Sequence, residues 1–211
     1  MKLSDKALLV QLNISQWTAR KYDKRATEQV AHQNGSASTA GRYNKSLLPM
    51  NDALNNIHQK STLIRKKFYT NTLPWGIEGT MMLPSANYLN FMTEFRKEKS
   101  DWQSLVDTFY QEYPRLHADA QRFLGNLYNR NDYPALHDIQ RKFKMDMAVF
   151  PVPSNDFRVS IGDEELERIQ QDVESRVQDA AQQAIRAADR QANTVMIKQQ
   201  QSYDLQLADG M

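Results

Sequence analysis

Hydrophobic and polar positions along the chain change their spacing several times, and each change predicts a new element. Residues 7–17 place apolar side chains at every second position, which is typical of a half-buried strand. The next stretch without periodicity, residues 33–44, is small and polar with two glycines, so we expect a loop there. The apolar face of the first stretch holds Leu8, Val10, Leu12 and Ile14.

Two long segments follow a helical period. In residues 45–69 the apolar positions recur three, four or seven apart, which predicts a helix with Pro49 in its first turn. A second stripe runs from the capping residue Ser85 to Leu127, and we expect it to face the first helix. Pro114 lies inside the stripe and removes a backbone donor, so the pattern predicts a kink or break beside it.

Shorter patterns surround these helices. Residues 80–83 predict a short strand after a Pro- and Gly-containing turn, and residues 133–143 have room for three helical turns. Residues 145–150 then alternate as a strand bounded by prolines, which suit a sheet edge because proline cannot donate to a ladder. A further strand is predicted over residues 157–161, and we expect these strands to pair with residues 7–17 in a small sheet.

From Asp163 the chain keeps a helical pattern past Gln200. Its apolar positions are in near-heptad register but are sparse and partly alanine, so the helix needs a partner for stability. We call this line of positions the seam and expect a second helix, from this or another chain, to pack on it. The seam comprises Leu166, Ile169, Val173, Val177, Ala180 and Ala184.

Together these patterns predict a mainly α protein with a small antiparallel β element, of the α+β class. Its long helices should be antiparallel, with an extended C-terminal helix. We expect residues 1–161 to form a helical domain with a small sheet, and residues 162–211 to form the long helix and a frayed tail.

Composition narrows the setting. The chain of 211 residues has no cysteine, which excludes disulfides and thiolate chemistry and permits a reducing compartment. The first apolar run is interrupted by Asp5 and Lys6, and no segment approaches a membrane span. We therefore expect a cytoplasmic protein that is neither exported nor inserted in a membrane.

The net charge of +2 conceals a gradient. Residues 1–75 carry 12 basic and 4 acidic side chains, whereas residues 162–211 carry 5 and 10. Such ends can attract one another, within or between chains, or the basic half can bind nucleic acid. The nucleic-acid alternative uses two basic clusters, with Trp17 or Tyr69 stacking on bases. The clusters are Arg20, Lys21, Lys24 and Arg25, and then Arg65, Lys66 and Lys67.

Signatures of catalysis and cofactor binding are absent from the sequence. It contains no phosphate-binding glycine loop, zinc-protease, hydrolase or EF-hand spacing. No glutamate precedes any of the four histidines at the spacing that bundle metal sites use. The acidic run from Asp163 to Glu167 is typical of a solvated helix start. We therefore predict no catalytic residues, no metal and no cofactor.

Several short motifs resemble a known family. They are Tyr133–Pro134, Phe143, the Pro-Val-Pro of residues 151–153 and Asp-Phe-Arg-Val at 156–159, with Phe-Leu-Gly-Asn-Leu-Tyr-Asn before them. Over residues 5 to about 180 the chain resembles a family of phage and bacterial proteins with a domain of unknown function. Members are often encoded near MoxR-type AAA+ ATPases and von Willebrand A proteins. The resemblance implies an adaptor or substrate beside such an ATPase, in the host cytoplasm if phage-encoded, and supplies no catalytic residues.

The sequence thus favours a non-enzymatic helical assembly or adaptor protein. It would self-associate or dock a protein partner through the helix that begins at Asp163. The alternative is a nucleic-acid-binding protein that uses the basic N-terminal half.

Overall fold

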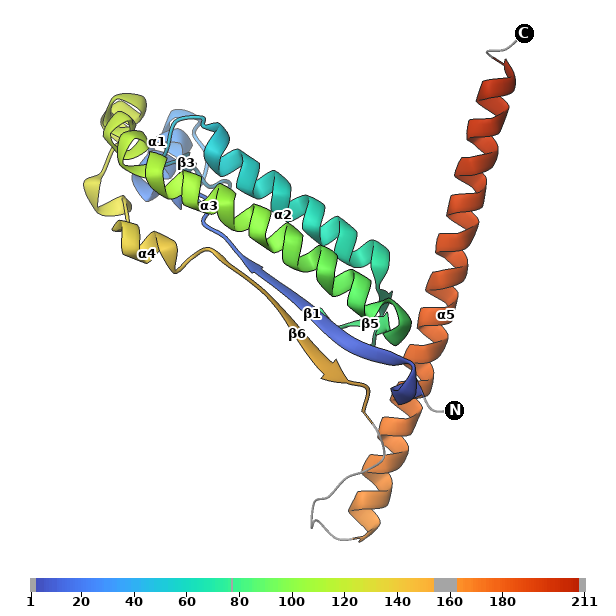
Figure 1. Cartoon of the computed structure of the whole chain (residues 1–211). Coiled ribbons are helices and arrows are strands. Elements are labelled where there is room, and N and C mark those ends of the chain that lie inside the picture. The colour runs from blue at the N-terminus through green and yellow to red at the C-terminus, as the bar shows by residue number, and fades with distance from the viewer. Residues whose placement is uncertain (1–2, 77, 154–162, 209–211) are drawn as a thin grey trace. The chain divides into compact units, whose positions relative to one another are not determined.

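A computed structural model describes residues 3–76, 78–153 and 163–208 of the chain. It is mainly helical, with a four-stranded antiparallel sheet and a two-stranded antiparallel sheet (Figure 1), which confirms the predicted fold class. The strands are β1 (Ala7–Ser15), β2 (Arg20–Tyr22), β3 (Asn44–Ser46), β4 (Leu73–Pro74), β5 (Met81–Pro84) and β6 (Lys144–Pro151). The α-helices are α1 (Lys24–Gln33), α2 (Asp52–Asn71), α3 (Tyr88–Leu124), α4 (Leu136–Gln140) and α5 (Asp163–Ala208).

The described residues form two compact units. One, the sheet unit, draws on residues 1–12, 65–94 and 147–211, and the other, the aromatic unit, on residues 13–64 and 95–146. The division passes through β1, α2, α3 and β6. The domain boundary predicted after residue 161 lies outside the described residues, so that division stays a prediction.

In the sheet unit, β5 is the pairing partner of both β1 and β4. The strand order is β4-β5-β1-β6, and Leu9 of β1 lies opposite Met82 of β5 while Val10 lies opposite Met81. The strand predicted at 80–83 is therefore confirmed within one residue. The strand predicted at 145–150 is β6, which lies at a sheet edge beside β1. Its last residue, Pro151, has no N–H to donate, and an edge strand tolerates this loss because it has a neighbour on one side only.

Both faces of this sheet are buried. Leu9 and Met82 contribute to one hydrophobic cluster with Trp75 and the α5 residues Ala180 and Ala184. On the other face, a second cluster is formed by Val10, Leu83, Phe68 of α2 and Phe91 of α3. The prediction of a half-buried first strand is thus wrong for its start, because α5 covers the face that the alternation assigned to solvent.

The aromatic unit is centred on a hydrogen-bonded tryptophan between α2 and α3, which lie side by side (Figure 1). The indole Nε1 of Trp102 donates to Ser61 Oγ at 2.8 Å, and Ser61 Oγ donates to Gln16 Oε1 at 2.7 Å. Ser61 is fully buried, and its hydroxyl both accepts and donates a hydrogen bond, as a buried polar group requires. Phe109 and Phe143 extend the core with ring centroids 5.6 Å apart. The expectation that the two long helices face each other is confirmed.

Capping interactions explain where the helical predictions missed. Helix α1, which we did not predict, begins where Asp23 accepts a hydrogen bond from the Ala26 amide. It ends with Gly35 at φ 59°, in a Schellman arrangement of amide donors. Helix α2 begins at Asp52 rather than at residue 45, because Asn51 Oδ1 caps the Leu54 amide and residues 44–46 form β3.

The remaining helices differ from the predictions in length. Helix α3 continues through Pro114, so of the predicted kink or break the break is wrong and the kink stays a prediction; the neighbours Tyr113 and Leu116 of that turn are buried. It ends at Leu124, where Gly125 adopts φ 51°. Helix α4 spans only five residues of the predicted 133–143. Helix α5 confirms the predicted C-terminal helix, whereas the strand predicted at 157–161 lies outside the described residues.

A buried lysine stabilises the antiparallel pair of strands β2 and β3 in the aromatic unit, which we call the β2–β3 pair. The Lys45 side chain is only 4% exposed, and its Nζ lies 2.7 Å from Asp23 Oδ2 and 2.8 Å from Asp132 Oδ2. It also donates to the Leu127 carbonyl at 2.6 Å, and Asp132 binds Lys21 as well. Burial opposes the charged form of Lys45, but the hydrogen bonds to Asp132 and Asp23 outweigh it and raise its pKa.

We predict that Lys45→Met destabilises the aromatic unit by about 3 kcal/mol, because it leaves two buried carboxylates without their shared partner. The urea midpoint, followed by tryptophan fluorescence, measures this change. Lys24→Met is the matched control, since Lys24 forms an exposed pair with Glu28. It should change stability by less than about 0.5 kcal/mol. Equal losses in both variants would contradict a structural role for the buried network.

Candidate functional site

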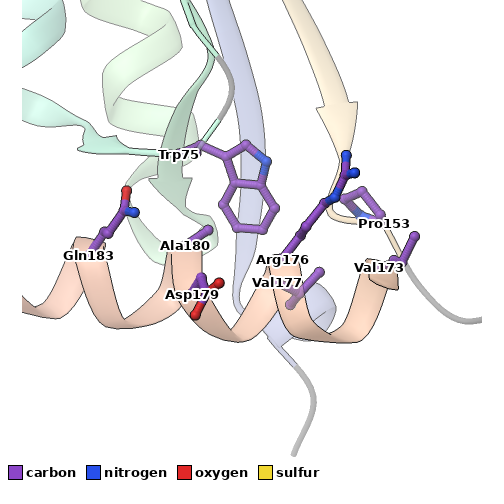
Figure 2. A pocket seen from close by; sticks show the side chains of 9 residues that line it. Trp75, Pro153, Val173, Arg176, Val177, Asp179, Ala180 and Gln183 are labelled. Atoms are coloured by element: carbon purple, nitrogen blue, oxygen red, sulfur yellow. The ribbon is translucent and has the colours of Figure 1, made fainter. Parts of the chain in front are cut away.

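One cavity of the sheet unit lies between α5 and the residues after β4. It has a volume of about 410 Å³, and Figure 2 shows the indole of Trp75 above α5 between Ala180 and Arg176. Small and apolar side chains form most of its wall. The lining comprises Trp75, Gly76, Pro153, Val173, Arg176, Val177, Asp179, Ala180 and Gln183.

The polar groups of this cleft all come from α5. Arg176 Nη2 lies 2.9 Å from Asp172 Oδ2 in an exposed pair one helical turn apart. Asp179 and Gln183 lie one and two turns further along. The cleft can therefore hold an apolar group against Trp75 while the guanidinium and amide bind its polar part.

The structure splits the predicted seam. Ala180 and Ala184 are buried and Val177 is half-buried, all against the sheet of the same chain. Ile169 and Val173 are half-buried. The side chain of Leu166 lies outside the described part of the chain. The C-terminal half of the seam is therefore used for intramolecular packing, because two alanines let α5 approach Trp75 and Met82 closely.

The predicted basic residues lie in two different units. Arg20 and Lys21 belong to β2 and Lys24 and Arg25 to α1, all in the aromatic unit. The second cluster is on α2 in the sheet unit and consists of Arg65, Lys66 and Lys67. Of the first cluster, Lys21 pairs with Asp132 and Lys24 with Glu28, whereas Arg20 and Arg25 are exposed and form no ion pair with any described residue.

The two aromatic residues predicted to stack on bases differ in exposure. Trp17 is buried against Phe109 and Tyr113, with ring centroids 6.2 and 5.8 Å away, so it offers no ring face to a base. Tyr69 is exposed on α2 and contacts Phe68 edge-on at 5.3 Å. Only the tyrosine can meet a ligand from solvent.

A column of rings at the C-terminal part of α3 contains the one buried side-chain polar atom without a hydrogen bond in the described residues, His117 Nε2. The imidazole stacks on Tyr133 at 4.4 Å and on Tyr113 at 5.8 Å. The tyrosine hydroxyls donate to the carbonyls of Leu47 and Pro134. Burial, and then the charge of Arg130, lower the pKa of His117.

No group of three or more His, Asp or Glu side chains among the described residues is arranged to hold a metal ion. Within the same residues, no helix combines the length and apolar character needed to cross a membrane.

Sequence reasoning missed the residues that shape these sites. Trp75 has no sequence pattern that predicts a binding role, although it forms part of the wall of the cleft. His117 carries no predicted role either, because no glutamate precedes it at the spacing of bundle metal sites. The capping pair Asp23 and Gly35 could have revealed α1, and with it the surface that α1 forms beside β2.

Comparison with known proteins gives no relatives: no family model, no curated protein and no solved structure matches the chain. The family resemblance stated from the short motifs therefore stays a prediction.

Replacing Ala184 with leucine should loosen α5 from the sheet, because it forces extra carbons into a closely packed contact at a cost of about 2 kcal/mol. Hydrogen exchange followed by mass spectrometry should show faster exchange of amides along α5. Gln182→Leu, which places the same side chain at an exposed position of the same helix, should leave that exchange unaltered. Unchanged protection in Ala184→Leu would contradict docking of α5 on the sheet.

The stability of the aromatic unit should fall as the pH drops below about 6.5, since His117 binds its proton more weakly when folded than when unfolded. The slope should reach at most about 1.4 kcal/mol per pH unit and level off below the folded-state pKa. Urea midpoints between pH 7.5 and 5 measure it. Tyr113, Tyr133 and Arg130 surround the ring and provide no carboxylate.

His117→Phe should flatten this pH dependence while keeping the stack, and His137→Gln, at an exposed histidine, should leave it intact. The lowered pKa values of Asp23 and Asp132 act in a separate window. Their contribution is complete above about pH 4 and is lost as the pH falls through their folded-state pKa. A flat wild-type profile would refute the role of His117.

Proposed function

We propose that this chain is a non-enzymatic assembly protein. The part of α5 after Ala184 would bind a second copy of the same chain. The observation that carries the proposal is a change in α5 after Ala184. Val177, Ala180 and Ala184 pack on the sheet, whereas Ile185 and Met196 are each 62% exposed. A helix with apolar residues on an open face gains stability by covering that face.

Four apolar residues of this part of α5, three of them exposed and Ala188 half-buried, form one line, which we call the stripe. Ile185, Ala188, Ala192 and Met196 are three, seven and eleven residues from its start, so they share a face at about 100° per residue. Ile185 points about 100° away from the buried Ala184. Docking of α5 on its own sheet therefore leaves the stripe available.

The order of sizes along the stripe suits a second copy. Large side chains stand at both ends and alanines in the middle. In an antiparallel pair related by a two-fold axis, Ile185 would meet Met196 of the other copy, and the alanines would allow close approach. An isologous contact of this kind needs no other protein.

Gly76 and Pro153, which line the cleft beside Trp75, are followed in the sequence by residues outside the described ranges, so the proposal does not rest on this cleft. The ATPase partner and the phage setting come from the family resemblance alone. They stay predictions, and an adaptor role would use the assembled form.

The test is the mass in solution by size-exclusion chromatography with light scattering. We expect wild type to approach twice 24.5 kDa as its concentration rises, and Ile185→Asp to remain at 24.5 kDa. Leu89→Asp is the control, because Leu89 is 76% exposed in the same unit but lies on α3. It should still dimerise.

Two outcomes would count against the proposal. A single-chain mass for wild type at every concentration would exclude the second copy as partner. Equal dimer loss in Leu89→Asp would show that the stripe is not the interface. Val177→Asp is unsuitable as the test because Val177 packs on the sheet, so its replacement would also undock α5.

A further inference from the structure

The aromatic unit carries a second surface, independent of α5, on the outer side of the β2–β3 pair. Residues directly opposite in the ladder share a face, and Lys21 lies opposite Lys45, so both turn inward to Asp132. Side chains alternate along a strand, and Arg20 and Tyr22 therefore lie on the outer face. Tyr22 is 45% exposed.

The loop before β3 adds to this surface. The Arg42 guanidinium lies over the Tyr22 ring, 5.9 Å from its centroid. The next residue, Tyr43, is 39% exposed, yet its backbone is fixed by hydrogen bonds to Thr27 Oγ1 and the Asp23 amide. Two accessible rings, Tyr22 on β2 and Tyr43 directly before β3, are thus held at defined positions.

The charge on this surface is uncompensated. Asp23 and Asp132 are bound to the inward lysines, and Glu28 to Lys24. Arg20, Arg25 and Arg42 are exposed and form no ion pair with any described residue. Arg20 and Arg42 therefore lie beside the rings, and Arg25 adds an exposed cation in the first turn of α1.

A hollow of about 260 Å³ adjoins these residues, between α1 and the loop of residues 34–43. Thr27, Val30 and Ala31 line its helix side, while Arg42 and Tyr43 line its other side together with small polar residues of the loop. It is smaller than the roughly 300–1,000 Å³ of ordinary ligand pockets, so it suits one ring system.

We propose that this surface binds single-stranded nucleic acid. Arg20, Arg25 and Arg42 would neutralise phosphates, Tyr22 and Tyr43 would stack on bases, and the hollow would admit one base. A single strand fits better than a duplex because stacking on protein rings needs unstacked bases. The surface differs from the set predicted from sequence, since it omits the buried Trp17 and the α2 cluster and adds Tyr22, Arg42 and Tyr43.

Fluorescence anisotropy of labelled oligo-dT, oligo-rU and a duplex of equal length, at several salt concentrations, tests the proposal. Three phosphate contacts predict a slope of about −2 for log K against log salt with single strands. Arg25→Glu with Arg42→Glu should lower the magnitude of that slope by about 1.4. Tyr43→Ala should weaken binding by about tenfold or more at unchanged slope.

Lys97→Glu with Lys99→Glu, an equal charge reversal at exposed positions of α3, is the matched control and should bind nearly as wild type. Arg25→Lys with Arg42→Lys should retain the salt slope, and circular dichroism checks that all variants fold. Absent binding, equal loss in the α3 control, or tighter binding of the duplex would each overturn the proposal. So would full competition by poly-glutamate at matched charge, which would indicate an acidic protein partner.

Discussion

The burial of β1 on both faces is the constraint on which the sheet unit depends. Leu9 and Val10 are adjacent, so their side chains point to opposite faces, and both are buried. One face is covered by the ends of α2 and α3 through Phe68 and Phe91. The other requires a further layer, which α5 provides. A four-stranded sheet with one strand of two residues could not protect that face by itself.

The same physical requirement gives α5 two different roles along its length. Alanines at 180 and 184 let the helix backbone approach Trp75 and Met82, where larger side chains would hold it away. After Ala184 the helix continues without a requirement from the sheet, and its large apolar residues Ile185, Met196 and Ile197 are exposed. A thin seam is thus sufficient for docking inside the chain, and the remaining stripe is what an assembly contact could use.

Charge is organised in the aromatic unit by a comparable division between inside and outside. Lys45, the inward lysine of β3, binds Asp23 and Asp132, because a buried ammonium is tolerated only with such partners. The outward arginines are left without acids of their own. The positive charge on the outer face of the β2–β3 pair therefore follows from the ion pairs that Lys45 forms on the inner face.

Hydrophobic periodicity was enough to predict the long helices, the edge strand and the mixed fold class, because it records which face of an element is apolar. The sequence also contained the caps at Asp23, Gly35 and Asn51, which local chemistry explains once they are noticed. Only the tertiary structure decided which face meets which partner. It buried Trp17, carried α3 through Pro114 and turned Lys45 inward, since each outcome depends on residues distant in the chain that no local pattern can specify.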